Sequence, residues 1–176
     1  MTRIGIVILA AAVAVGFACS PQSAAHGDYR REVGARYIVE ARGERTAVVA
    51  RNPMAVRIER FAVKNGCAPE LAPELAELLA ECRYPRVLAA IACRESRFNL
   101  KARGAVGEVG MFQVKKEIWG SPGKTCFSQV RKTRDILDLL VAESGGKLSV
   151  AIAKYNGSGS QAKKYAKAVM KLAASI

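Results

Sequence analysis

The chain has 176 residues, of which 28 are Lys or Arg and 15 are Asp or Glu, and 51% are hydrophobic. This composition excludes a disordered tail or a low-complexity linker, and the ordinary Gly and Pro contents exclude a collagen-like repeat. The length suits one hydrophobic core and is too short for two enzymatic domains of ordinary size. The formal net charge of +13 predicts attraction to a polyanion: nucleic acid, an anionic membrane or an acidic cell-wall polymer.

Residues 1–25 are typical of an export signal. A short basic leader ending at Arg3 precedes the apolar run Ile4–Ala18, which suits a signal-peptide core but is short for a membrane span. Small residues at 23–25 predict cleavage before His26. A lipoprotein signal ending at Cys19 is the alternative, and only then do we expect contact with a membrane. Export to the periplasm or the extracellular space argues against nucleic acid as a partner.

Four cysteines remain when Cys19 is set aside: Cys67, Cys82, Cys93 and Cys126. In an oxidising compartment this even number predicts two disulfides, and the spacing leaves all three pairings open. A zinc site is the less favoured alternative, because the chain has no Cys-x-x-Cys and its only histidine is His26. We therefore expect neither a metal nor a cofactor.

Residues 26–66 show no clear helical pattern and are expected to form a basic N-terminal extension. The apolar stretches Tyr37–Val39 and Thr46–Ala50 flank the polar segment Glu40–Arg45, which predicts either a small hairpin or a loose basic lead-in.

Residues 67–176 are expected to form a mainly α-helical domain. Leucines between Leu71 and Leu79 recur at three- and four-residue steps, which indicates an amphipathic helix. A second helix should begin at Pro85 and end near Phe98–Asn99. Further apolar patterns predict helices from Ile136 to Gly145–Gly146, over Leu148–Ala153 and over Gln161–Ala174.

Glu95 is the strongest candidate for chemistry, because it lies near the end of an otherwise apolar helix with Ser96 beside it. Apolar surroundings penalise the charged form of a carboxyl group, so its pKa should rise and the group could hold a proton at neutral pH. A general acid needs that property. An ion pair with Arg94 or Arg97 is the alternative, although sequence neighbours point to different sides of a helix.

The segment Gly104–Gly110 is not a phosphate-binding loop, because it lacks the dinucleotide spacing and the P-loop lysine. Its glycines would instead let the backbone approach a sugar, with Met111 and Phe112 as an apolar wall and Gln113 as an amide that donates and accepts hydrogen bonds. An ordinary loop packed on the core is the alternative. Tyr155-Asn156-Gly157 is likewise either a helix cap and turn or part of a site.

Three segments in this order resemble the lytic transglycosylase family with the soluble-transglycosylase (SLT) type of lysozyme-like domain: Pro85–Asn99, Gly104–Val114 and Ala151–Gly157. The resemblance spans about residues 70–172. It implies a mainly α, lysozyme-like helical fold of the goose-type or SLT-like kind. Two departures are visible: Met111-Phe112-Gln113 stands where Leu-Met-Gln is common, and Asp135–Leu139 replaces a common Asn-Ile pattern.

The resemblance also implies a reaction on peptidoglycan glycan strands: cleavage of the MurNAc-β-1,4-GlcNAc bond that leaves a 1,6-anhydro end. Glu95 matches the family's single acid/base, and the substrate's N-acetyl group would replace the second carboxylate of ordinary glycosidases. The remaining matches are Ser96 and Gln113 on the sugar, Met111 lining the cleft, Tyr155 orienting Glu95, and Asn156 shaping the turn.

Two other functions stay open on the sequence. A hydrolytic muramidase would need a second carboxylate that places water, for which Glu108 and Glu117 are the candidates. A non-catalytic wall-binding or secretion-apparatus module would use the positive charge for docking, and envelope-spanning assembly proteins would then be its partners.

Overall fold

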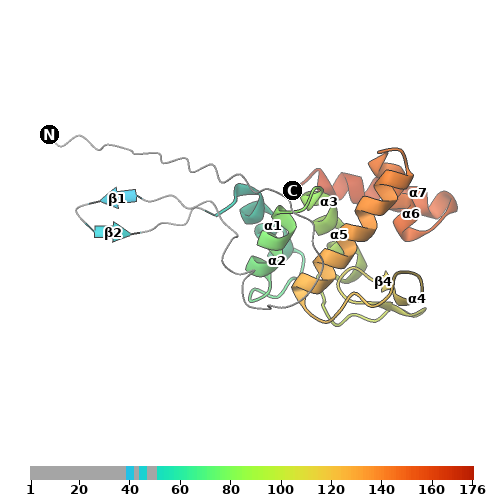
Figure 1. The fold of residues 1–176 in the computed structure, drawn as a ribbon, viewed down its shortest axis with the longest axis horizontal. Coiled ribbons are helices and arrows are strands. Elements are labelled where there is room, and N and C mark those ends of the chain that lie inside the picture. Colours follow the sequence, from blue (N-terminus) through green and yellow to red (C-terminus); the bar gives the residue numbers. More distant parts are fainter. Residues whose placement is uncertain (1–38, 42–43, 47–50) are drawn as a thin grey trace, which may run out of the picture. The chain divides into compact units, whose positions relative to one another are not determined.

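The computed structural model describes residues 39–41, 44–46 and 51–176 (Figure 1). The chain divides into two units, Met1–Asn52 and Pro53–Ile176. The expected export signal, with Cys19 and His26, lies outside the described residues.

In the first unit, strand β1 (Val39–Ala41) pairs antiparallel with strand β2 (Glu44–Thr46), and Val39 lies opposite Thr46. Of the two alternatives for this segment, the small hairpin is therefore the one observed. Tyr37, Ile38 and residues 47–50, which the expected strands included, lie outside the described residues.

The second unit is mainly helical, as the sequence predicts, with one small sheet inserted after the third helix (Figure 1). Its elements are α1 (Pro53–Lys64), α2 (Ala72–Ala80), α3 (Pro85–Ser96), β3 (Glu108–Val109), β4 (Val114–Lys115), α4 (Lys116–Trp119), α5 (Cys126–Glu143), α6 (Leu148–Asn156) and α7 (Gly159–Ala173). Strands β3 and β4 are antiparallel, with Glu108 opposite Lys115.

Helix α3 is the central helix of this unit. It packs against α1, α2 and α7, and all residues from Val87 to Ala92 are buried. A helix that is apolar on every side belongs in the interior, which explains its position. Pro85 begins it as predicted, and left-handed backbone at Arg97 (φ 53°) and Phe98 (φ 67°) ends it at Ser96, slightly before the expected end.

Helix α1 lies where no helical pattern was expected, so that prediction was wrong. Its apolar residues Met54, Ile58, Phe61 and Ala62 recur at three- and four-residue steps, so an amphipathic pattern was present and was missed. Because α1 packs against α2 and α3, the compact unit begins at Pro53, inside the segment expected to be the N-terminal extension.

Helix α5 also begins earlier than its apolar pattern indicated. Thr125 Oγ1 accepts a hydrogen bond from the Ser128 backbone at 3.1 Å, and Ser128 Oγ accepts one from the Thr125 backbone at 3.1 Å. This reciprocal pair is a capping box and fixes the helix start at Cys126.

The two expected disulfides are not present, because all four described cysteines are free. Cys67, Cys82 and Cys126 are packed into the hydrophobic core as apolar residues, and the Cys82 thiol donates to the Leu78 carbonyl at 3.3 Å. Burial raises the pKa of Cys67 and of Cys82 to about 11 and that of Cys126 to about 12.

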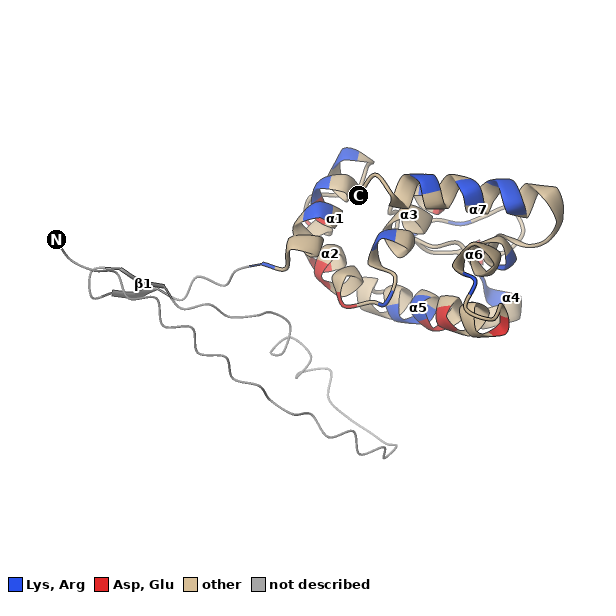
Figure 2. Cartoon of the chain, turned by 90° about the horizontal axis from the view of Figure 1, so that it is seen from above, with Lys and Arg blue, Asp and Glu red and all other residues tan. Residues whose placement is uncertain are grey.

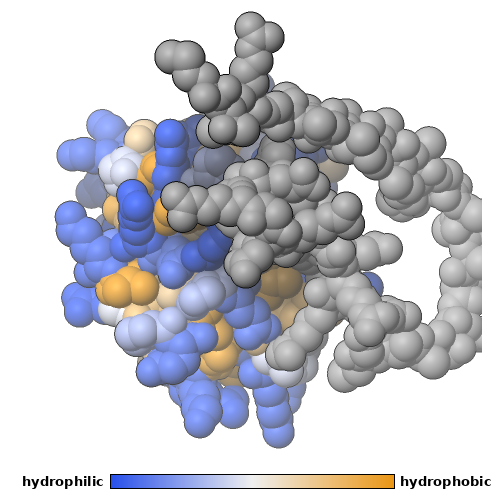
Figure 3. Space-filling model, turned by 90° about the vertical axis from the view of Figure 1, so that its left-hand side faces the viewer, coloured by the Kyte–Doolittle hydropathy of each residue, from blue (hydrophilic) through white to orange (hydrophobic). Residues whose placement is uncertain are grey.

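The surface of the second unit is mostly hydrophilic where Figure 3 shows it, with hydrophobic residues interspersed. Helix α7 carries Lys163, Lys164, Lys167 and Lys171 and no acidic residue (Figure 2). Among the described residues, no helix has the length and apolar character that crossing a membrane requires.

Candidate active site around Glu95

Glu95 lies in the last turn of α3 and is partly buried. Its Oε1 accepts a hydrogen bond from the Tyr165 hydroxyl, which α7 brings in from 70 residues further along the chain. The Arg94 guanidinium stacks on the Tyr165 ring, with its carbon 5.4 Å from the ring centroid. The two helices thus hold a carboxyl group and a phenol together beneath an arginine.

Burial raises the pKa of Glu95, and the negative charge of Glu108 raises it further. The Tyr165 hydrogen bond and the Arg94 charge oppose this shift, because both stabilise the carboxylate. The net direction is upward, as the sequence predicted from apolar surroundings. Such a carboxyl group keeps its proton to a higher pH than an exposed glutamic acid does and can donate it to a substrate.

Tyr165 was missed in the sequence, where Tyr155 was expected to orient Glu95. The Tyr155 hydroxyl instead donates to the Phe112 carbonyl at 2.7 Å and so ties α6 to the turn before β4. Both tyrosines are partly buried, and burial raises the pKa of each. A signal for Tyr165 was present, because it lies on the apolar side of an amphipathic helix whose other face is lysine-rich.

Ser96 joins the end of α3 to the segment before β4. Its hydroxyl donates to the Met111 carbonyl at 2.7 Å and accepts from the Asn99 backbone at 3.0 Å. Met111, expected to line the cleft, is fully buried in the core. Met111 therefore contributes to the site through its backbone groups and not through its side chain.

Gln113 is partly buried and adopts a left-handed conformation with φ 49°. Its Nε2 donates to the Gly110 carbonyl at 2.9 Å. A non-glycine residue in this region is strained, and such strain is concentrated at functional sites. Asn156, which was expected to shape the turn, is exposed at the last residue of α6, and Gly157 ends the helix.

Gln129 is a buried polar residue that the sequence analysis did not single out. Its Oε1 accepts from the Met111 backbone at 2.6 Å, and its Nε2 donates to the carbonyls of Leu100 at 3.0 Å and Gly123 at 3.3 Å. A Cβ on Gly110 would lie 2.5 Å from Gln129 Oε1, so only glycine fits there. One amide from α5 thereby fixes three segments around the small sheet.

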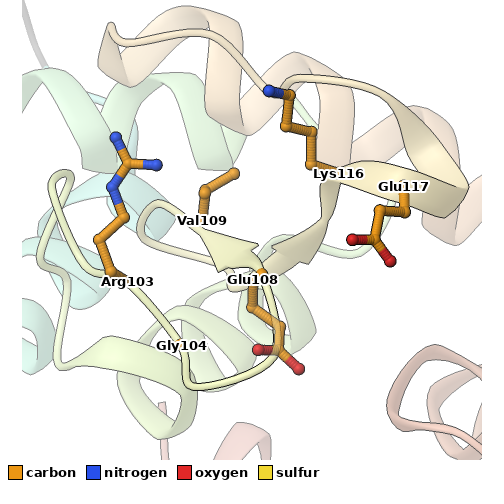
Figure 4. Close-up of a pocket in the computed structure, with 7 residues that line it drawn as sticks. Arg103, Gly104, Glu108, Val109, Lys116 and Glu117 are labelled. Atoms are coloured by element: carbon orange, nitrogen blue, oxygen red, sulfur yellow. The ribbon is translucent and has the colours of Figure 1, made fainter.

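A pocket of about 380 Å³ lies beside the small sheet, and Arg103, Glu108, Val109, Lys116 and Glu117 line it together with Gly104 and Gly107 (Figure 4). Glu108 is the lining residue whose charge acts on Glu95. Its Oε2 accepts from the Val106 backbone at 3.2 Å. Within the described residues, no three His, Cys, Asp or Glu side chains are grouped as a metal site would require.

The comparison with known proteins identifies one family. A family model described as the transglycosylase SLT domain matches residues 77–176, from within α2 to the end of α7, and so covers more than half of the chain. No curated protein and no solved structure matches the chain. The match includes Glu95, Tyr165 and the small sheet with its pocket. The chain therefore belongs to the transglycosylase SLT domain family.

Proposed function

We propose that this protein is an exported lytic transglycosylase that cleaves the MurNAc-β-1,4-GlcNAc bond of peptidoglycan and leaves a 1,6-anhydro-MurNAc end. The family match supports a peptidoglycan-acting function of the lytic transglycosylase type in general. The observation that carries the assignment of the acid/base is the position of Glu95: partly buried at the end of the central helix, hydrogen-bonded to Tyr165, with a raised pKa.

The proposed reaction uses one carboxyl group twice. Protonated Glu95 gives its proton to the glycosidic oxygen as the bond from that oxygen to the anomeric carbon breaks. The C6 hydroxyl oxygen of the same muramic residue then bonds to the anomeric carbon and gives its proton to the Glu95 carboxylate. The starting protonation state is restored and no water is consumed. The Tyr165 hydroxyl stabilises the carboxylate between the two steps.

The other site residues take different proposed roles. Gln113 presents a half-buried amide beside the pocket, which suits hydroxyl and acetamido groups of a sugar, and Asn156 presents an exposed one. Ser96 acts as a positioning residue, since its hydroxyl is engaged by two backbone groups.

The test is muropeptide analysis of purified sacculi digested with the wild-type protein and with Glu95→Gln. Removing a general acid/base should lower activity about 10²–10⁴-fold, while Glu143→Gln, on an exposed carboxylate 3.8 Å from Lys154 Nζ, should leave it unchanged. Mass spectrometry should find anhydro ends. If neither wild type nor variant releases muropeptides although both bind sacculi, the protein is a wall-binding module and the proposal fails.

A hydrolytic muramidase is the second candidate, favoured by one observation: the charge of Glu108 acts on Glu95, so a second carboxylate lies near the acid. Hydrolysis in water enriched in heavy oxygen would label the new reducing ends. The transglycosylase reaction incorporates no solvent oxygen, so unlabelled anhydro products decide against hydrolysis.

Export is proposed from residues 1–25 alone. Intact mass analysis of protein recovered from the envelope fraction tests it. A chain beginning at His26 supports cleavage by signal peptidase, and a diacylated N-terminal Cys19 supports the lipoprotein alternative. An uncleaved cytoplasmic chain contradicts both.

A further inference from the structure

The pocket beside the small sheet contains balanced charge. Two cationic side chains, Arg103 and Lys116, and two carboxylates, Glu108 and Glu117, line it. In Figure 4 the two cations lie on one side of the β3–β4 ribbon with Val109 between them, and the two carboxylates lie on the other. Among the described residues, no ion pair joins any of these four side chains to another of the four.

Two exposed apolar residues lie next in sequence to residues that line the pocket. Val106 is 70% exposed and Ile118 is 65% exposed, which makes them the most exposed large hydrophobic residues in the described part of the chain. Val106 lies in the loop between Gly104 and Glu108, and Ile118 follows Glu117 in α4. Exposed apolar residues next to a pocket lined by charged groups indicate a ligand that is charged in one part and apolar in another.

We propose that this pocket binds the stem peptide of peptidoglycan through the zwitterionic end of its diamino acid. Arg103 and Lys116 take the carboxylate, Glu117 and Glu108 take the ammonium group, and Val106 and Ile118 contact the aliphatic part of the peptide. The proposal rests on the proposed function, since it identifies the substrate feature that is recognised beside the bond to be cleaved.

The arrangement of charge selects a zwitterion over a simple ion. A monoanion would be attracted by the two cations but repelled by the two carboxylates a few side-chain lengths away, and a diamine would meet the opposite balance. A ligand that carries an ammonium group and a carboxylate on the same carbon atom can bind the cations and the carboxylates of the pocket at once. The absence of a side chain at Gly104 lets the Glu108 carboxylate lie against the loop backbone, because a Cβ on Gly104 would lie 2.3 Å from Glu108 Oε2.

Proximity to the catalytic group supports a substrate peptide rather than an unrelated zwitterion. Glu108 lines the pocket and its charge raises the pKa of Glu95, so a ligand held there lies within electrostatic range of the acid. The stem peptide branches from the muramic residue at which the proposed cleavage occurs. A peptide in the pocket would thus help to choose the muramic residue presented to Glu95.

Calorimetry with the full-length Glu95→Gln protein tests binding without turnover. The probe is synthetic L-Ala-γ-D-Glu-meso-diaminopimelate, compared with one analogue whose side-chain amine is acetylated and another whose side-chain carboxylate is amidated. Each modification should weaken binding about tenfold or more, as expected for loss of a partly buried charged contact. If both analogues bind as tightly as the parent peptide, or if the parent peptide does not bind, the proposal is overturned.

A cycle of variants assigns each charge. Arg103→Gln should weaken binding of the parent peptide but not of the amidated analogue, and Glu117→Gln should weaken the parent peptide but not the acetylated analogue. Lys163→Gln, which removes a charge from the exposed face of α7, is the matched control and should change neither. Equal losses for all three variants would show non-specific attraction and contradict the proposal.

Activity separates this inference from the proposed function. Arg103→Gln should lower kcat/KM more on peptide-bearing glycan than on glycan stripped of its peptides, and Lys163→Gln should leave both values unchanged. If the wild-type protein cleaves neither glycan but the peptide cycle holds, the pocket stands and the enzyme assignment fails. If cleavage occurs with equal efficiency on both glycans, the pocket proposal fails and the enzyme assignment stands.

Discussion

Replacing Tyr165 by Phe removes one hydroxyl from the site and little else. That hydroxyl donates to Glu95 Oε1, while the ring remains beneath the Arg94 guanidinium in its 5.4 Å stacking contact. The substitution leaves no large cavity, and α7 keeps its buried alanines and Val169. The change therefore tests the hydrogen bond rather than the packing.

The magnitude follows from the charge on the acceptor. A hydrogen bond to an ionised group contributes about 1.5–3 kcal/mol, and each 1.36 kcal/mol corresponds to about tenfold in rate. The carboxylate form of Glu95 occurs between proton donation and proton recovery, so Tyr165→Phe should lower kcat/KM about tenfold to a hundredfold. Because this hydrogen bond lowers the pKa of Glu95, its loss should raise that pKa further.

The assay is kcat/KM against pH on soluble glycan, with Tyr155→Phe as the matched control. Protonated Glu95 is the active form, so the alkaline limb should move to higher pH in Tyr165→Phe. Tyr155→Phe removes a hydrogen bond to the Phe112 carbonyl and should lower the free energy of unfolding by about 1 kcal/mol while leaving the limb in place.

The reverse result would refute this reasoning. If Tyr155→Phe moves the alkaline limb and Tyr165→Phe does not, Tyr155 orients the acid, as the sequence first suggested. Loss of a hydrogen bond to a charged group should lower kcat/KM by far more than about twofold. If neither variant changes kcat/KM by more than that, the contact between Tyr165 and Glu95 has no catalytic role.

Three further predictions concern charge, packing and thiol chemistry. Glu108→Gln removes a charge that raises the pKa of Glu95, so the alkaline limb of the pH profile should move to lower pH; a shift to higher pH would contradict it. Gly110→Ala (φ 80°) should lower the free energy of unfolding by about 2–4 kcal/mol, because the new methyl group is strained and overlaps the buried Gln129 amide of α5. In the control Gly145→Ala (φ 60°) the methyl group meets no atom within 4 Å, so the loss should be only about 1 kcal/mol. Equal losses in denaturant titrations would contradict the overlap at Gly110. Cys126, whose pKa burial raises to about 12, should resist alkylation at neutral pH until the protein is unfolded, and rapid labelling of the native protein by mass spectrometry would contradict this.

The sequence predicted those parts of the fold that strong apolar periodicity or proline encodes. Helix α3 begins at Pro85 and carries Glu95 near its end, as expected, because a proline suits the first turn of a helix and the apolar residues that follow favour a buried element. Helix α1 also carries a helical apolar pattern, in Met54, Ile58, Phe61 and Ala62, and was missed because the arginines of this segment were interpreted as part of a basic extension.

The partners of the site residues could not be predicted in the same way. The Tyr165–Glu95 hydrogen bond spans 70 residues, and the choice between Tyr155 and Tyr165 depends on how α6 and α7 are rotated about their axes. The carbonyls to which Gln129 donates belong to loops, and loop sequences lack the apolar periodicity from which helices and strands are predicted. Long-range pairing of polar groups is a property of the packed structure, and local spacing in the sequence does not contain it.

Small residues explain how two helices bring a phenol to a carboxyl group. Helix α3 contributes buried Ala89, Ala90 and Ala92, and α7, which packs against it, contributes buried Ala162 and Ala166. Alanines at a helix contact allow the axes to approach toward the lower end of the usual 8–10 Å separation. Within such a contact the Tyr165 side chain can extend past the interface to the last turn of α3, where Glu95 lies. The packing of α3 against α7 therefore places the Tyr165 hydroxyl within hydrogen-bonding reach of a carboxyl group 70 residues earlier in the chain.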